Sequence, residues 1–102
     1  MTQLQHTLNR EFTFEGKGLH TGKVAKMILK PAPVDSGIRF LRSDIGPEAI
    51  VSAVADNVSS TARSTTITKN EVSVVTIEHV LSALTGMGID NALIDIDNIE
   101  VP

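Results

Sequence analysis

Apolar and polar residues alternate along much of the first two thirds of the chain, and this period of two predicts short β-strands with one buried face. The apolar residues of each of the first two segments share a face: Leu8, Phe12 and Phe14 in the first, and Ala25, Met27 and Leu29 in the second. The first segment covers about residues 7–15. Lys26 and Lys30 lie on the opposite face of the second, as expected for a half-buried strand.

Turn residues separate these segments from further strand candidates. The segment PAPVDSG, residues 31–37, combines two prolines with Asp-Ser-Gly and predicts a turn. Residues 69–71 predict a second, tight turn. The remaining strand candidates are residues 38–41, the weaker segments 50–55 and 64–68, and residues 72–75. A meandering antiparallel sheet is the simplest assembly of these strands.

One later segment changes to the period of a helix. Its apolar residues stand at i, i+3, i+4 and i+7 and form a single stripe: Ile77, Val80, Leu81 and Leu84. Thr76 is the expected N-cap, and Gly86 and Gly88 supply the stop. The sequence therefore predicts one amphipathic helix that begins next to Thr76.

The order of predicted elements is mostly β, then α, then β. A final strand is predicted from three alternate apolar residues, Ala92, Ile94 and Ile96. We expect an α+β fold, a two-layer sandwich in which a mostly antiparallel sheet is covered by one or two helices. The second helix would be only a weakly signalled turn. With 102 residues the chain fits one domain that buries roughly 60–65% of its unfolded surface.

Composition narrows the classes of partner and compartment. The formal net charge is −3, and three Phe with no Trp or Tyr offer few stacking surfaces, so nucleic acid is an unfavourable partner. No apolar run approaches the roughly 20 residues that cross a bilayer, and the start MTQLQHTLNREF lacks the apolar core of a signal peptide. The chain has no cysteine, which suits a reducing compartment and leaves His, Asp and Glu as metal ligands. We expect a cytoplasmic protein with no transmembrane segment.

Glu78 and His79 are the strongest candidates for chemistry. At the helical step they fall about 100° and 200° from Ile77, so both side chains face away from the apolar stripe. They also lie in the first turn, where the helix dipole favours a carboxylate and disfavours a protonated imidazole. A neutral imidazole can ligate Zn²⁺ while a neighbouring carboxylate takes a proton from water. The pair therefore suits metal-assisted hydrolysis.

A plain structural explanation of the same pair stays open. Glu78 would then be a favourable first-turn acid and His79 an exposed surface residue, because the spacing does not match His-Glu-x-x-His. A catalytic zinc usually takes three protein ligands. The spacing of His6, His20 and His79 does not predict that they converge, and His6 is assigned no role. If His79 binds zinc, the other ligands are expected outside this chain.

The segment GKGLHTGK, residues 16–23, is a second candidate. It places three glycines, His20 and two lysines between predicted strands, where glycine lets the backbone approach a ligand and His or Lys could contact phosphate. It is not a P-loop, because the glycine spacing is wrong and Val24 replaces the Ser or Thr. The alternative is a glycine-rich hairpin with solvated lysines.

Five blocks in order, GKGLHTGK, LKPAPVDSGIRFLRSD, STTI, TIEHVLSALTGMGIDNALIDI and EVP, resemble the N-terminal domain of the UDP-3-O-acyl-N-acetylglucosamine deacetylase family. The resemblance covers essentially the whole chain, and TIEHVLSAL followed by GIDNA is its most specific part. It implies a zinc-dependent deacetylase that hydrolyses the N-acetyl group of UDP-3-O-(3-hydroxyacyl)-N-acetylglucosamine, the committed step of lipid A biosynthesis in Gram-negative bacteria. It also implies two domains with a βα-sandwich fold, like domain 2 of ribosomal protein S5, that face each other across the active site.

The resemblance implies roles for individual residues. Glu78 matches the general base and His79 matches one of the zinc ligands, with the other ligands in the C-terminal domain. His20 matches a position near the polar part of the substrate, so it is a candidate for substrate binding. Arg63 stands at the rim, where the family often has a bulkier apolar residue. The isolated fragment is then expected to be inactive without its C-terminal domain.

A function of another class also fits: a stand-alone α+β binding or interaction module, since such folds serve unrelated functions. It would bind partners through the face that carries Glu78 and His79. The sequence ends at residues 99–102 with no polar tail and no helix stop, which favours a piece of a longer enzyme.

Overall fold

The computed structural model describes residues 4–62 and 64–102, so Arg63 lies outside the described residues. The elements in chain order are β1 (Phe12–Lys17), β2 (Val24–Pro31), β3 (Ile38–Arg42), β4 (Ile50–Ser52), the 3₁₀ helix η1 (Ala55–Asn57), β5 (Val58–Ser60), β6 (Thr66–Lys69), β7 (Val72–Val75), α1 (Glu78–Gly86) and β8 (Ala92–Ile96). The expected α+β class is confirmed, and η1 is the weakly signalled second helical turn. In the described part of the chain, no helix is both long and apolar enough to span a membrane.

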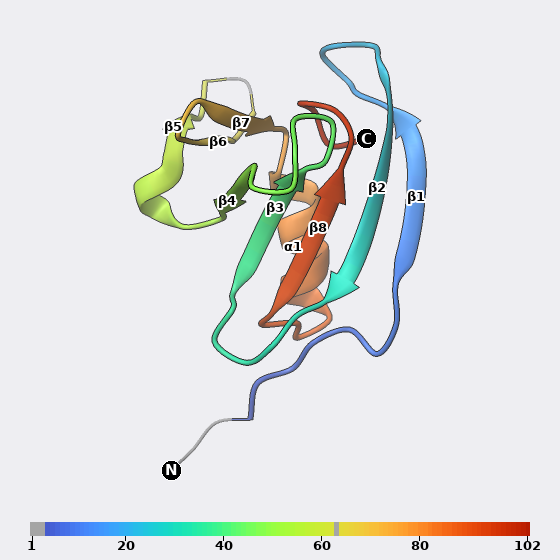
Figure 1. Ribbon diagram of the computed structural model, residues 1–102, viewed down its shortest axis with the longest axis vertical. Coiled ribbons are helices and arrows are strands. Elements are labelled where there is room, and N and C mark those ends of the chain that lie inside the picture. Colours follow the sequence, from blue (N-terminus) through green and yellow to red (C-terminus); the bar gives the residue numbers. More distant parts are fainter. Residues whose placement is uncertain (1–3, 63) are drawn as a thin grey trace.

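The strands form two sheets. The prediction of a single antiparallel meander is therefore wrong about the number of sheets and the order of the strands. The larger sheet has the order β1-β2-β8-β3-β4 and the smaller the order β5-β6-β7 (Figure 1). Strand β8 is antiparallel to β2 but parallel to β3. A parallel neighbour requires a long crossover, and here the chain passes through the small sheet and α1 before β8 enters between β2 and β3.

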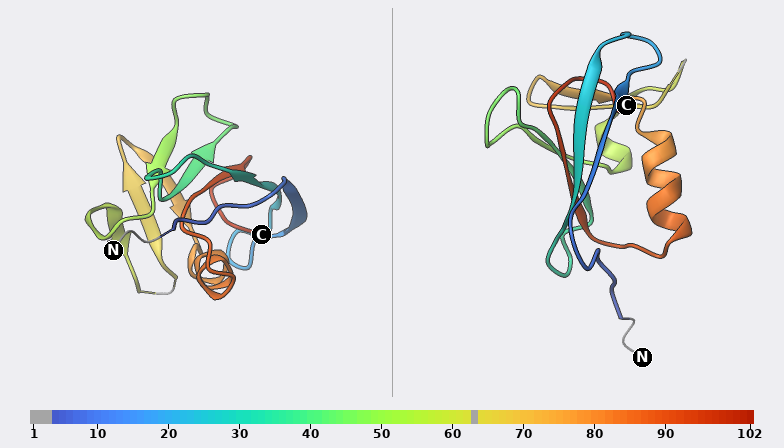
Figure 2. Two further views of the ribbon diagram at one scale, coloured as in Figure 1. Left: turned by 90° about the horizontal axis from the view of Figure 1, so that it is seen from below. Right: turned by 90° about the vertical axis from the view of Figure 1, so that its right-hand side faces the viewer.

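The core lies between the large sheet and α1, which covers one face of that sheet (Figure 2). The predicted stripe is confirmed: Ile77, Val80 and Leu84 are buried and Leu81 packs against the core. The central strand β8 contributes three side chains that are 0% exposed, Ala92, Ile94 and Ile96. These residues belong to the common core, with β8 in the middle of the large sheet.

The edge strand β1 begins later than predicted. Thr7 forms an isolated parallel bridge with Asn91, and regular pairing with β2 starts only at Phe12. Leu8 is buried as expected, whereas Phe14 is 48% exposed. An edge strand has a neighbour on one side only, which leaves Phe14 less covered than the apolar residues of β2.

The two ends of α1 differ in how well the sequence predicts them. The stop is confirmed, because Gly86 is the last helical residue and Gly88 has φ +72°, a left-handed conformation that glycine adopts without strain. The predicted cap is wrong. Ile77 occupies the N-cap position without a side-chain hydrogen bond, and Thr76 has φ +62° and donates its hydroxyl to Glu100 instead.

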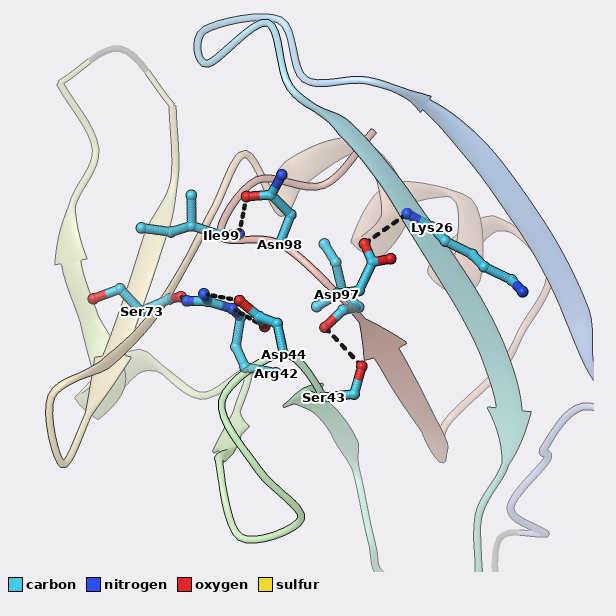
Figure 3. A network of polar contacts seen from close by, with 9 residues as sticks. Lys26, Arg42, Ser43, Asp44, Ser73, Asp97, Asn98 and Ile99 are labelled. Carbon is cyan, nitrogen blue, oxygen red and sulfur yellow. Dashed lines mark hydrogen bonds and ion pairs between the residues drawn. The ribbon is translucent and has the colours of Figure 1, made fainter.

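Arg42 at the end of β3 joins the two sheets (Figure 3). Its Nη1 donates to the carbonyl oxygen of Ser73 on β7 at 2.9 Å, while Nε and Nη2 donate to Asp44 at 2.9 and 2.6 Å. The hydrogen bonds from this guanidinium hold the pKa of Asp44 below its usual range. Arg42 therefore ties the small sheet to the large one through one backbone contact, and its bidentate ion pair with Asp44, in the β3–β4 connection, orients the guanidinium.

Candidate functional site

Glu78 and His79 lie in the first turn of α1, as predicted, and both point away from the most buried part of the core. Glu78 is half-buried and His79 is exposed. The backbone of Thr65 holds this turn, because its carbonyl oxygen accepts from the Ile77 amide at 3.3 Å. The Thr65 amide lies 3.4 Å from each carboxylate oxygen of Glu78. These contacts are longer than an ordinary N–H···O bond, so the carboxylate keeps lone pairs available for another proton.

The segment GKGLHTGK covers the end of β1 and the connection to β2. The amide of Gly18 donates to the carbonyl of Lys23 at 2.9 Å, and the amide of Gly22, with φ +69°, donates to the carbonyl of Gly18 at 3.0 Å. The segment is therefore a glycine-rich hairpin connection, and whether it contacts a phosphate stays open. The side chain of His20 is exposed at the tip, and its role in substrate binding stays a prediction.

Glu100 is the residue that sequence reasoning missed. It is 1% exposed, and its carboxylate accepts three neutral donors. The amide of Thr21 donates to Oε1 at 2.8 Å, and the amide of His20 lies 3.1 and 3.0 Å from Oε1 and Oε2. The hydroxyl of Thr76 donates to Oε2 at 2.8 Å. Glu100 therefore joins the loop that carries His20 to the segment that leads into Glu78.

These donors keep Glu100 ionised in spite of its burial. Burial alone raises the pKa of a carboxyl group, but the hydrogen bonds from the amides of Thr21 and His20 and the hydroxyl of Thr76 outweigh it and lower the pKa of Glu100 to about 2. The carboxylate is thus a fixed negative charge at neutral pH.

One signal in the sequence could have identified Glu100. Every second residue of β8 is buried, namely Ala92, Ile94 and Ile96, and the same alternation leads to Glu100. An extended chain would therefore turn the Glu100 side chain toward the interior. A charged residue at a buried position needs polar partners. The glycines and backbone amides of the segment GKGLHTGK were candidates for that role.

His6 lies away from this site. Its carbonyl oxygen accepts the amides of Asp90 and Asn91, just beyond the C-terminal end of α1, and its ring lies 3.7 Å from the Asp90 carboxylate. Asn91 is 3% exposed and uses its side chain to bind Gln5 and the amide of Gly37. The block GIDNA therefore anchors the N-terminal segment, and His6 is at the opposite end of α1 from His79.

The β1–β2 connection, the start of α1 and the end of the chain lie together at one end of the molecule (Figure 2). In residues 4–62 and 64–102, no group of three or more His, Asp or Glu side chains lies close enough together to hold a metal ion. His79 offers a suitable donor for zinc, a solvent-accessible imidazole. The donor set of the described residues thus fits one ligand of such a site and not a complete site.

Comparisons with known proteins place this geometry in an enzyme family. A model of the UDP-3-O-acyl N-acetylglycosamine deacetylase family matches residues 5–102. A UDP-3-O-acyl-N-acetylglucosamine deacetylase from Citrifermentans bemidjiense is 51% identical over 98 residues, which are 96% of this chain and 32% of that protein. The protein of the same name from Teredinibacter turnerae is 46% identical over the same shares. A bifunctional enzyme LpxC/FabZ from Porphyromonas gingivalis is 47% identical over 100 residues, 98% of this chain and 22% of that protein.

Together with the fold, these matches define the class of the molecule, an α+β chain of an enzyme family whose model covers almost all of its residues. The chain belongs to the UDP-3-O-acyl N-acetylglycosamine deacetylase family. It spans about a third of the length of the deacetylases from Citrifermentans bemidjiense and Teredinibacter turnerae that it matches.

Proposed function

We propose that this chain is the first domain of a zinc-dependent amide hydrolase that removes the N-acetyl group from UDP-3-O-(3-hydroxyacyl)-N-acetylglucosamine. The reaction would be the committed step of lipid A biosynthesis in the cytoplasm of a Gram-negative bacterium. One observation carries the proposal: a chain that matches this family presents Glu78 and His79 together at the outward-facing start of α1. The C-terminal domain of the same protein would complete the site, and the isolated chain would be inactive.

Glu78 is the proposed general base. Its carboxylate is half-buried and has only long contacts to the Thr65 amide, at 3.4 Å, so it can accept a proton from the water that attacks the acetamide carbonyl.

His79 is the proposed zinc ligand of this domain, and its exposure leaves room for ligands from the rest of the protein. Zn²⁺ would supply Lewis acidity that polarises the carbonyl group and makes water more acidic. His20 is proposed to contact the polar part of the substrate from the tip of the β1–β2 connection.

Acetate release from the UDP-linked substrate by the native-length protein tests this proposal. We expect Glu78→Gln to lower kcat by about 10²- to 10⁴-fold, the usual contribution of a general base. Glu48→Gln, an exposed substitution of the same chemistry in the β3–β4 connection, should leave kcat unchanged. Activity lost on chelation should return when zinc is added.

A folded, zinc-loaded, native-length protein that releases no acetate would contradict the proposal. Equal activities of Glu78→Gln and wild type would contradict the role of Glu78 alone. The alternative function, a stand-alone binding module, would then be the next candidate, although the matches to enzymes over almost the whole chain give it no support.

A further inference from the structure

Glu100 carries a buried negative charge whose partners are all neutral. The carboxylate is bound by two backbone amides and one hydroxyl, and no described residue forms an ion pair with it. Moving a carboxylate out of water is costly unless its oxygens are fully hydrogen-bonded. A packed apolar side chain would fill the same space without that cost. A carboxylate at residue 100 is therefore best explained by the groups that it holds in place.

The donors come from two segments that are far apart in the sequence. His20 and Thr21 supply consecutive amides of the β1–β2 connection, and Thr76 supplies a hydroxyl two residues before Glu78. A single carboxylate thus holds the backbone of the proposed substrate-binding residue and the segment that leads into the proposed base and zinc ligand.

The main chain fixes the position of Glu100 itself. The amide of Val75 donates to the carbonyl of Ile99 at 2.8 Å, and the amide of Val101 donates to the carbonyl of Val75 at 3.1 Å. These two bonds bracket Glu100 as a short parallel bridge with Val75 at the end of β7. The carboxylate is therefore placed by the fold, and the loop is placed by the carboxylate.

We infer that Glu100 is a positioning residue that sets the His20 loop relative to the first turn of α1. The inference rests on the proposed function, since it assigns a consequence for the same site. Glu100 is almost fully buried, so it acts through the backbone of His20 and does not contact the substrate.

Gly18 provides independent support from the shape of the loop. A Cβ atom at Gly18 would lie 2.8 Å from Cδ of Glu100 and 2.8 Å from Oγ1 of Thr21, closer than side chains tolerate. A Cβ at Gly16 would meet only Cβ of Pro102, at an ordinary 3.5 Å. The loop can thus approach the carboxylate only with glycine at position 18, and the two glycines make a matched pair for substitution.

A double-mutant cycle in the native-length protein tests the inference. Glu100→Gln keeps the size of the side chain but replaces one acceptor oxygen by an amide nitrogen, which faces a donor. We expect kcat/KM for acetate release to fall about 10- to 100-fold, the effect of a small misplacement near reacting groups, with zinc content unchanged. In a His20→Ala background the same substitution should cost less than about threefold, because coupled residues are not additive.

An equal fold-decrease in both backgrounds would assign Glu100 a general structural role and overturn the inference, as would an unchanged kcat/KM. Gly18→Ala tests it without altering the charge: we expect about a 10-fold decrease in kcat/KM, whereas Gly16→Ala keeps wild-type activity. Equal activities of the two alanine variants would also overturn it. If the wild-type protein releases no acetate, both the proposed function and this inference fail. If the activity depends on Glu78 but neither Glu100→Gln nor Gly18→Ala changes it, only this inference fails.

Discussion

Two carboxylates of this domain, Glu100 and Asp44, are held ionised by different means. Asp44 receives a bidentate contact from the guanidinium of Arg42, and its side chain is 33% exposed. Glu100 is 1% exposed and receives only backbone amides and a hydroxyl. An ion pair near solvent contributes little free energy and tolerates small shifts, whereas amides around a buried anion must each point at it. The comparison indicates that Asp44 orients the Arg42 side chain that joins the sheets, whereas Glu100 sets a loop.

Alanine at each position should give the largest contrast. Glu100→Ala leaves two amides and a hydroxyl without their acceptor, so we expect it to lower the free energy of unfolding by about 3–5 kcal/mol, because hydrogen bonds to charged groups contribute strongly and unpaired buried donors are costly. Asp44→Ala should lower it by about 1 kcal/mol or less. Urea unfolding of both variants of the 102-residue chain measures the difference. Equal losses would remove the distinction between the two carboxylates.

The pH dependence of stability should separate them next. The pKa of Glu100 is lowered from 4.5 to about 2 in the folded chain, so its contribution to stability is fully present above about pH 4.5 and is lost as the pH falls through about 2. The shift corresponds to about 3 kcal/mol. Glu100→Gln should therefore show a smaller loss of stability between pH 5 and pH 2 than wild type.

The matched measurement uses Asp44→Asn. The pKa of Asp44 is also lowered, so its contribution too is lost toward low pH, but partial exposure screens it and the change should be much smaller. If Glu100→Gln loses as much stability as wild type between pH 5 and pH 2, the buried carboxylate does not titrate as the structure implies.

Local patterns in the sequence predict the elements of this domain better than their arrangement. The stripe of α1 and the alternation in β8 are strong because each element buries one face, and both agree with the structure. The insertion of β8 beside β3 and the separate small sheet depend on contacts across long stretches of chain, which no local period encodes. Residues 58–60 form β5 although all three are exposed and carry no period.

In the candidate site, too, the sequence predicts the features that depend on local pattern and not those that depend on long-range contacts. Glu78 and His79 were predicted because a helical step and a helix dipole are local properties of the chain. Thr76 was expected to cap α1, but Glu100 binds its hydroxyl from 24 positions away. A hydroxyl group that could cap a helix can instead donate its hydrogen bond to a distant residue that the tertiary structure brings close.

Arg42→Lys offers the smallest test of the comparison. Lysine keeps the charge but cannot reproduce the planar fork that binds Asp44 and the carbonyl of Ser73 at the same time. We expect the free energy of unfolding to fall by about 0.5–1 kcal/mol, with the loss reduced in an Asp44→Asn background because the two residues share one interaction. Urea unfolding measures both values. Since the side-chain hydrogen bonds of Arg42 go to Asp44 and Ser73 and not to the His20 loop, kcat/KM of the native-length protein should stay at the wild-type value. A decrease as large as that of Glu100→Gln would mean that the sheet junction also positions the site.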